Sequence, residues 1–454
     1  MSKKLVVMLL AAVLAFGASI AQATPSRLET LGQGTGLVYV QDDTDIFYNP
    51  ATLGYYRNVG LLHLGGEDGD MYALGGLSLG LGDMLTVGLI FARNPAYELG
   101  ALSVMWWGNA ALDPAGFPTS PRWLWNDNWA AYPGTYIVDI TSIGGYDRAM
   151  EWMNPIDIIL AAKLGNMQLG VSWYTASGKH ESAYEDDTPT DSSETFKSRI
   201  NALKVGLSAD MGNVMPEVWF HWVPFKVSST WEDDILNTEV NRELKGRRFN
   251  LGARAFLKMS DALTIVPAIE WSNVNGDVSI DTTPDFYPVA GTLLIEEDLS
   301  ENYKGNRINA GIGLNYAVDK VLIATSIGLQ WSSFTRTLEV DGLTGSEEEV
   351  RKWLALPVVG LGVEYQATKI VTFRGGISTT TIYARDRNED SADTVGSLNY
   401  EDTSSITSQN TTASVGLGLN FGNLVIDLTA GNMLVAGEPA ASSLFSALDA
   451  KYKF

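Results

Sequence analysis

The chain has 454 residues, no cysteine, 10% aromatic residues and a formal net charge of −22 at pH 7. The lack of cysteine excludes a disulfide framework, thiolate catalysis and cysteine-bound metals. The negative charge argues against nucleic acid as a partner, because phosphates require a basic surface.

The first 23 residues have the three parts of a secretory signal peptide. Lys3 and Lys4 precede an apolar run from Leu5 to Phe16, and Ala21-Gln22-Ala23 supplies a small-residue cleavage site. We expect residues 1–23 to be removed; a retained N-terminal anchor is the alternative. No later stretch reaches the ~18–20 apolar residues of a membrane helix. An exported chain of this kind is therefore either soluble or a closed β-barrel.

Residues 24–58, the hatch segment, are too polar and glycine-rich for a lipid-facing strand. At their centre, the acidic pair Asp42-Asp43 is followed by Phe47-Tyr48 and by Asn49-Pro50-Ala51. Asn before Pro favours a turn, and Pro cannot continue a hydrogen-bonded ladder. One interpretation is therefore a turn that leads into the first strand.

The same stretch resembles the N-terminal region of the long-chain fatty-acid transporter (FadL-type) family of outer-membrane proteins. In that family this region forms a hatch inside a 14-stranded barrel, so the resemblance implies a hatch containing Asn49, Pro50 and Ala51. Thr52 stands where the family usually has glycine. Barrels associated with type IX secretion (PorV-type) have a similar stretch, so the resemblance extends to a superfamily.

From residue 59 onward, predicted strands are joined by short turns on one side and by long acidic connections on the other, as in outer-membrane barrels. Seven tight turns carry residues that short hairpins need: Gly82-Asp83, Gly165-Asn166, Met211-Gly212-Asn213, Ser260-Asp261, Val318-Asp319-Lys320, Ala367-Thr368-Lys369 and Gly422-Asn423. These turns predict 16 strands. The short first two, near Val59–Gly65 and Met71–Leu81, leave 14 open.

Each predicted strand has an apolar face for lipid and a small, polar face for a lumen. The apolar face tends to end in aromatic rings, which favour membrane interfaces: Trp271, Tyr316, Trp331, Trp353, Tyr365, Phe421 and Phe454. Several charged residues are expected to face the lumen and to pair with one another or to line a polar path: Arg254, Lys258, Glu270, Glu364, Arg374, Asp427, Asp449 and Lys451.

The remaining charged and titratable residues suggest no catalytic chemistry. Acidic runs such as Glu181–Glu194 and Asp386–Asp402 are expected to be solvated loops, or to bind divalent cations that bridge lipopolysaccharide. His63, His180 and His221 are the only histidines, and none has a partner at metal-ligand spacing. We therefore expect no enzyme activity, catalytic residue, metal or cofactor.

Residues 94–155 contain six of the 13 tryptophans and six prolines. A loop this long is usually functional or disordered, and disorder does not fit so many large rings. We expect a packed extracellular cap over the barrel mouth. Its tryptophans would form a groove for an apolar solute, stack on sugar rings, or only hold the cap together; the FadL-type resemblance favours the groove. The candidate contacts are Trp106, Trp107, Trp123, Trp125 and Trp129.

The chain ends on a strand that alternates to its last residue, with Leu448, Ala450, Tyr452 and Phe454 on one face. A terminal aromatic resembles the signal by which the barrel-assembly machinery recognises outer-membrane barrels. The resemblance assigns this role to Tyr452 and Phe454.

Together these features predict an all-β, transmembrane outer-membrane β-barrel of 14–16 antiparallel strands over residues 59–454, with a hatch at 24–58 and a cap at 94–155. The predicted function is passive uptake of a hydrophobic small molecule, such as a long-chain fatty acid or hydrocarbon. Outer-membrane lipid and lipopolysaccharide would surround the barrel. The alternative is a non-transporting scaffold or a secretion-associated, PorV-like barrel. A water-filled porin is disfavoured because a hatch would block it.

Overall fold

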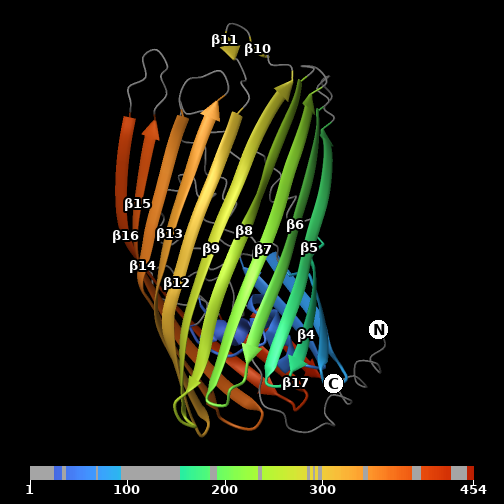
Figure 1. Cartoon of the computed structure of the whole chain (residues 1–454), viewed down its shortest axis with the longest axis vertical. Coiled ribbons are helices and arrows are strands. Elements are labelled where there is room, and N and C mark those ends of the chain that lie inside the picture. The colour runs from blue at the N-terminus through green and yellow to red at the C-terminus, as the bar shows by residue number, and fades with distance from the viewer. Residues whose placement is uncertain are drawn as a thin grey trace.

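Within the residues that the computed structural model describes, sixteen antiparallel strands close into one barrel (Figure 1). Each strand pairs with its neighbours in chain order, except that β9 pairs with β12 because β10 and β11 form a separate small sheet. Pairing of β1 with β18 closes the cylinder. The prediction of an all-β barrel is confirmed, and the strand number is 16 rather than the 14 that the family resemblance implied.

The described residues are 25–32, 37–67, 70–93, 154–184, 192–233, 238–283, 287–289, 292–294, 299–340, 346–390, 400–430 and 447–454. The predicted signal peptide and the five candidate tryptophans of the insertion lie outside them. The helices are α2 (Pro25–Thr30), α3 (Asp45–Tyr48) and the 3-10 helix η1 (Pro50–Tyr55). The strands are β1 (Val59–Glu67), β2 (Asp70–Leu81), β3 (Leu85–Phe91), β4 (Ile156–Leu164), β5 (Met167–Tyr184), β6 (Ser192–Ala209), β7 (Val214–Asp233), β8 (Thr238–Lys258), β9 (Leu263–Thr283), β10 (Tyr287–Val289), β11 (Thr292–Leu294), β12 (Leu299–Val318), β13 (Val321–Val340), β14 (Ser346–Gln366), β15 (Val371–Asp390), β16 (Tyr400–Asn420), β17 (Leu424–Ala430) and β18 (Ala447–Lys453).

All seven predicted tight turns are present, and they lie at one end of the barrel, which we call the tight-turn end. Gly165 and Gly422 show why glycine is used there. Their φ angles are +66° and +81°, in a region that side chains other than glycine rarely occupy. The turn residues that were identified in the sequence therefore determine where the chain reverses in these hairpins.

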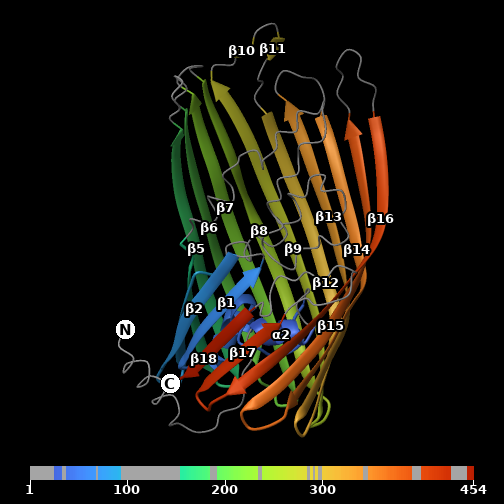
Figure 2. The same ribbon diagram turned by 180° about the vertical axis from the view of Figure 1, so that it is seen from behind.

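The barrel wall has a tall side and a low side. Strands β5–β9 and β12–β16 have 18 to 21 residues, whereas β1–β4, β17 and β18 have 7 to 12. Figures 1 and 2 show the tall and the low side from opposite directions. A tilted strand of about 9–11 residues crosses a membrane. The long strands therefore continue well past the height that the short strands reach.

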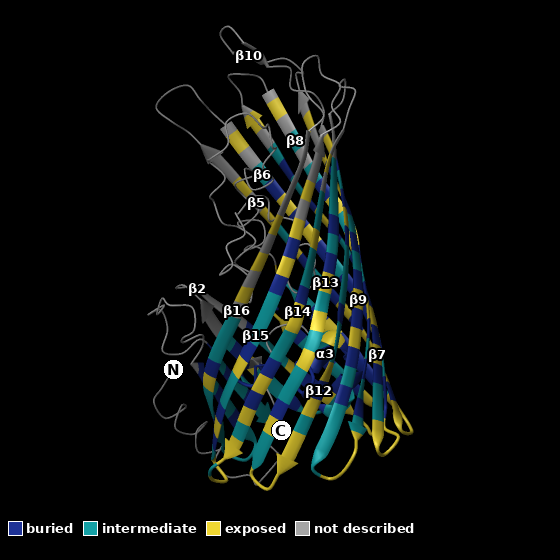
Figure 3. Ribbon diagram, turned by 90° about the vertical axis from the view of Figure 1, so that its left-hand side faces the viewer, coloured by how far each residue is buried: buried dark blue, intermediate teal, exposed yellow. Residues whose placement is uncertain are grey.

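Exposed apolar side chains form a belt next to the tight-turn end. On β7, for example, Val218, Phe220 and Trp222 point outward with 45%, 41% and 41% of their surface exposed. Figure 3 shows the resulting alternation of exposed and buried residues along the strands. Tryptophans are the last large apolar residues exposed on four of the described strands: Trp173, Trp222, Trp271 and Trp331. This belt has the length and the aromatic border of a lipid-facing surface.

Beyond the belt, the apolar face of the long strands changes from the outside to the inside. On β7, Trp222 points outward, but Val223, Phe225 and Val227 point into the barrel and are at most 6% exposed. The outward residues there are polar, as at Lys226. The acidic runs that were expected to be loops are therefore partly strand. The side chains that face the lumen are also not small and polar along the whole strand, as was predicted. A change of face of this kind occurs where a strand leaves lipid for water while keeping an apolar interior.

Trp353 was predicted to face lipid, and this prediction is wrong. The pairing of β14 with its neighbours shifts between Ala355 and Val358. Such a bulge moves the residues that follow onto the opposite face. Trp353 consequently lies opposite Ser332, which is buried on the lumen side.

Candidate functional site

The described part of the hatch segment lies inside the barrel, towards the tight-turn end. Helix α2 contacts β15–β18, whereas η1 contacts β3–β6 on the other side of the lumen. Figure 2 shows α2 at the height of β17 and β18. Between the two helices, Tyr39 contacts β12 and β13. The segment therefore crosses the lumen from one wall to the other.

The predicted hatch residues Asn49, Pro50 and Ala51 are fully buried at the start of η1. The Asn49 side chain accepts a hydrogen bond from the Ala51 amide (3.1 Å) and donates one to the Leu207 carbonyl of β6 (3.2 Å). The hydroxyl of Thr52 donates to the Asn49 carbonyl (2.8 Å). Asn49 thus caps η1 and attaches it to the wall, and threonine is accommodated at position 52.

Glycines of the wall form the surface on which the hatch segment sits. A Cβ atom on Gly170 of β5 would lie 2.1 Å from the Ala51 nitrogen, and one on Gly206 of β6 would lie 1.8 Å from Asn49 Oδ1. On the opposite side, a Cβ on Gly362 would lie 2.4 Å from the Leu31 carbonyl oxygen. Strand glycines commonly mark places where another backbone approaches closely. The sequence shows these glycines, but only their inward position reveals this use.

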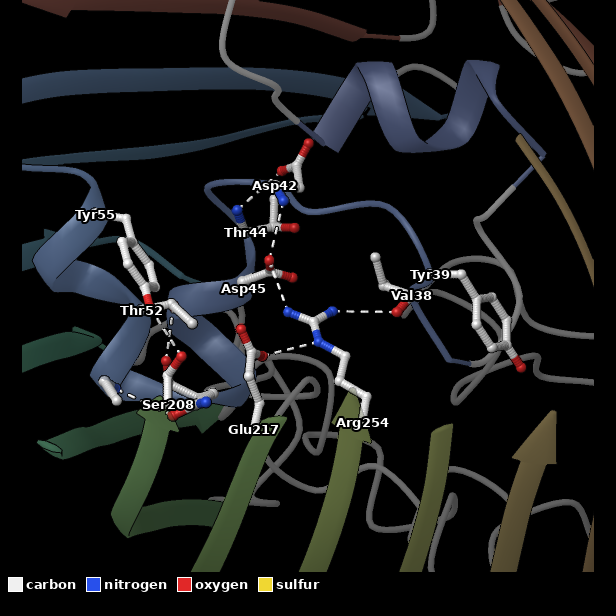
Figure 4. Close-up of polar contacts among 12 residues, drawn as sticks. Val38, Tyr39, Asp42, Thr44, Asp45, Thr52, Tyr55, Ser208, Glu217 and Arg254 are labelled. Atoms are coloured by element: carbon white, nitrogen blue, oxygen red, sulfur yellow. Dashed lines mark hydrogen bonds and ion pairs between the residues drawn. The ribbon is translucent and has the colours of Figure 1, made fainter. Parts of the chain in front are cut away.

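A buried arginine joins the hatch segment to the wall at its centre. Arg254 of β8 forms ion pairs with Asp45 of α3 (2.7 Å) and with Glu217 of β7 (2.9 Å). Its Nη1 also donates to the Val38 carbonyl (3.1 Å). Figure 4 shows the guanidinium among these three residues, none of which is more than 9% exposed. One side chain therefore ties two parts of the hatch segment to two neighbouring strands.

The closing strand β18 provides a second attachment. Lys451 forms an ion pair with Asp43 (2.8 Å), and the Asp449 carboxylate accepts a hydrogen bond from the Ser26 amide (2.8 Å). Asp449 also pairs with His63 of β1. The hatch segment is thus bound to β18, and Asp449 connects it through His63 to β1, the other strand of the seam that closes the barrel.

The lumen charges were expected to pair with one another, and this is correct only in part. Glu364 binds Arg374 of the wall and Arg27 of α2, both at 2.7 Å. Arg374 also pairs with Asp427. Within the wall Glu270 lies 3.8 Å from Arg307, and at the tight-turn end Lys258 pairs with Asp261. Four of the predicted charges bind the hatch segment, three of them in addition to a residue of another strand: Arg254, Glu364, Asp449 and Lys451.

Asp42 has a buried carboxyl group within the hatch segment. Burial, followed by the neighbouring charge of Asp43, raises the pKa of Asp42 well above its ordinary value of 3.8. Its Oδ1 accepts a hydrogen bond from the Thr44 amide (2.9 Å), whereas Oδ2 has no hydrogen-bond partner among the described residues. Despite these acids, the described part of the chain contains no cluster of three or more side chains suited to a metal ion.

The outer half of the lumen has an apolar lining that the sequence analysis missed. These residues form the outer apolar wall, and each is at most 7% exposed: Tyr174, Phe196, Ile200, Val223, Phe225, Val227, Leu244, Val274, Val278, Tyr303 and Phe334. The Phe225 ring lies over Gly246 of β8, and the rings of Tyr303 and Phe334 stack at 5.9 Å. The sequence does contain a sign of this lining: after each tryptophan that borders the belt, the apolar residues change from the outward to the inward face of the strand.

Comparison with known proteins gives only distant likenesses. No protein-family model and no curated protein matches the chain. Among solved structures, the toluene transporter TbuX of Ralstonia pickettii is 11% identical, with a TM-score of 0.40, over 95% of this chain and 99% of its own. The toluene transporter TodX of Pseudomonas putida is 10% identical, with a TM-score of 0.37, over 96% and 97%. In the described residues, no helix is long and apolar enough to span a membrane.

Proposed function

We propose that this chain is an outer-membrane channel that takes up hydrophobic small molecules passively and belongs to the FadL-type superfamily. The observation that carries the proposal is the outer apolar wall. A water-filled pore is lined by polar side chains, whereas here Phe225, Val227 and many of their neighbours on the inner face of the wall are apolar. Such a surface favours a solute that has apolar area to bury, at roughly 25 cal/mol per Å².

The hatch segment supports the same function. It crosses the lumen below the outer apolar wall and is held by buried ion pairs through Arg254 and Lys451. A lumen crossed in this way suits selective passage better than general diffusion of water and ions. The hatch would separate an apolar outer compartment from the periplasm.

The exterior supports placement in the outer membrane. The belt bordered by Trp173, Trp222 and Trp271 matches the height of a membrane-spanning strand. Lipid and lipopolysaccharide would surround this belt, and the barrel-assembly machinery would insert the chain through its last strand.

Uptake of a radiolabelled long-chain fatty acid and of a monoaromatic hydrocarbon into proteoliposomes tests the proposal. Phe225→Asp places a charge in the apolar lining and should reduce uptake strongly, whereas Lys226→Asp, on the outer face of the same strand, should not. Replacing Trp106, Trp107 and Trp125 together by Ala should also weaken uptake if the insertion contributes to the path. The matched control replaces three lipid-facing tryptophans: Trp173, Trp222 and Trp271.

The scaffold alternative predicts a different outcome of the same experiment. The parent protein would then show no saturable binding or uptake of apolar solutes, and it would co-purify with other envelope proteins. Absence of uptake by the parent would overturn the proposal. Unchanged uptake in the insertion triple mutant would limit those tryptophans to a structural role.

A further inference from the structure

Cations gather on the outer surface of β6–β8, directly beyond the aromatic border of the apolar belt. At that border Leu203, Trp222 and Phe249 lie opposite one another on the three strands. Because side chains alternate between the two faces of a strand, the next three outward positions of each strand follow from the register. They are Asn201, Arg199 and Lys197 on β6, Pro224, Lys226 and Ser228 on β7, and Arg247, Lys245 and Glu243 on β8.

This surface reverses the charge balance of the chain. Acidic residues outnumber basic ones by 53 to 31 in the whole sequence, whereas these nine positions hold five cations and one carboxylate. Glu243 pairs with Lys226 (2.7 Å) and lies 4.0 Å from Lys245. Lys245 also lies opposite Asp277 of β9. Two of the five cations therefore have carboxylates beside them.

The other three cations, which we call the basic patch, are Lys197, Arg199 and Arg247, and all three are exposed. In the described ladder, their outward neighbours include no carboxylate. Lys197 lies opposite Lys179 and Ser228, Arg199 opposite Ser177 and Lys226, and Arg247 opposite Pro224 and Asn275. Like charges that face each other across strands are unfavourable. An anion bound between these side chains would relieve that repulsion.

The basic patch is continuous with the lipid-facing belt. The Arg247 guanidinium lies 5.6 Å from the centre of the Phe249 ring, and that ring lies 6.2 Å from the Phe220 ring of the belt. Below the patch, Leu203 and Trp222 are 43% and 41% exposed. The same three strands thus present an apolar surface, an aromatic border and then cations. This order fits an amphiphile with acyl chains and an anionic head group better than it fits a free anion or an acidic protein.

The position of the basic patch indicates which lipid it faces. It lies on the side of the belt away from the tight turns, where the long strands continue past the belt. In outer-membrane barrels the short turns are periplasmic, so this side belongs to the outer leaflet. The characteristic lipid of that leaflet is lipopolysaccharide, whose lipid A carries two phosphates and several acyl chains. Strands are ~4.8 Å apart, so β6 and β8 place Arg199 and Arg247 about 10 Å apart across β7.

We infer that the basic patch binds the phosphorylated head group of lipopolysaccharide directly, with the acyl chains on the belt below it. Guanidinium groups suit this role because they bind phosphate through paired hydrogen bonds. The inference rests on the proposed placement in the outer membrane and is independent of transport. It differs from bridging by divalent cations, which would use the acidic runs of the chain instead of Lys197, Arg199 and Arg247.

Binding of diphosphoryl lipid A to the purified full-length barrel in detergent tests the inference. Each Lys or Arg near an anionic lipid surface contributes about fivefold in affinity. Replacing Lys197, Arg199 and Arg247 together by Gln should therefore weaken binding roughly tenfold or more. The matched control changes the charge equally at the tight-turn end, where Lys163, Lys320 and Lys369 are exposed; their replacement by Gln should leave binding unchanged. Lys197→Arg combined with Arg199→Lys and Arg247→Lys should retain most of the affinity.

The parent protein provides a test that needs no variant. Its binding of diphosphoryl lipid A should persist in EDTA, decrease with added salt because charges are screened, and exceed its binding of dephosphorylated lipid A and of phosphatidylglycerol. Equal affinity for the dephosphorylated lipid would overturn the inference, and loss of binding in EDTA would assign the lipid to cation-bridged carboxylates.

Two further results would overturn the inference. One is equal binding of phosphatidylglycerol, which would make the surface a general anionic-lipid surface; the other is equal affinity of the basic-patch variant and the tight-turn control. If the triple variant does not assemble, Arg199→Gln and Arg247→Gln are measured singly, and unchanged affinity in both would have the same meaning. A parent protein that binds lipid A but takes up no apolar solute would contradict only the transport proposal.

Discussion

Arg254 of β8 and Asp45 of the hatch segment lie 2.7 Å apart, with side chains that are 4% and 0% exposed. The guanidinium also binds Glu217, so one buried cation neutralises two carboxylates on different parts of the fold. Attraction in such an environment is strong, but so is the cost of removing one partner. Substitution of Arg254 is therefore the most direct way to test what holds the hatch segment in place.

Arg254→Met should release the hatch segment, because Asp45 and Glu217 would be left buried without a cation. Breaking a buried pair of this kind costs about 3–5 kcal/mol. Limited proteolysis of the purified barrel should then cleave within residues 24–58, while the barrel itself remains heat-resistant on gels. Lys258→Met is the control, because that side chain is on the same strand and pairs with the exposed Asp261 at the tight-turn end. Equal protection of the hatch segment in both variants would contradict this role for Arg254.

Gly170→Ala tests whether the close approach of β5 to the hatch segment holds the segment in place. The new Cβ would lie 2.1 Å from the Ala51 nitrogen, so η1 would have to move away from β5. We expect faster proteolysis around residues 49–55 and faster amide exchange there. In Gly375→Ala the new Cβ has its nearest neighbour at 3.8 Å, and this control should leave the hatch segment unchanged. Identical amide exchange in the two variants would mean that a glycine at position 170 is not needed to position the hatch segment.

The attachment of the hatch segment should weaken as the pH rises. Burial and Asp43 raise the pKa of Asp42 when the segment is docked, so the docked state binds the proton more tightly than the released state. The stabilisation is fully present below the ordinary pKa of 3.8 and is lost as the pH rises through the raised value. Asp42→Asn should reduce this dependence, because burial also raises the pKa values of Asp43 and Asp45, and should hold the segment more firmly at pH 7. Protease protection measured across pH would show it; a parent profile that is flat or rises with pH would contradict the assignment.

Deleting Phe454 should impair assembly of the barrel. The Phe454 amide donates to the Asn58 carbonyl (3.0 Å), and its ring is 55% exposed at the end of the closing seam. The terminal aromatic also resembles the signal read by the assembly machinery. The heat-resistant fraction in outer-membrane extracts should fall on deletion and be retained in Phe454→Tyr. Equal assembly of the deletion variant would remove this role.

The sequence predicted the features that follow from local chemistry. Turn glycines such as Gly165 located the hairpins, and lipid-facing residues such as Ile312 and Leu314 alternated as expected. The outer apolar wall was missed because the apolar face changes side after Trp222, which a fixed period-2 template cannot follow. The ion pair between Asp45 and Arg254 could not be predicted either. It depends on how the hatch segment crosses the lumen, and the shape of the lumen is defined only by the closed barrel.

Conductance in planar bilayers tests most directly the claim that the hatch segment plugs this barrel. The parent protein should conduct ions poorly, because the described part of the hatch segment crosses the lumen and is tied to β8, β14 and β18. A variant that keeps the signal peptide but lacks residues 24–58 should show a much larger conductance once its assembly has been verified. Large and equal conductance before and after the deletion would contradict the account and identify the protein as an open porin.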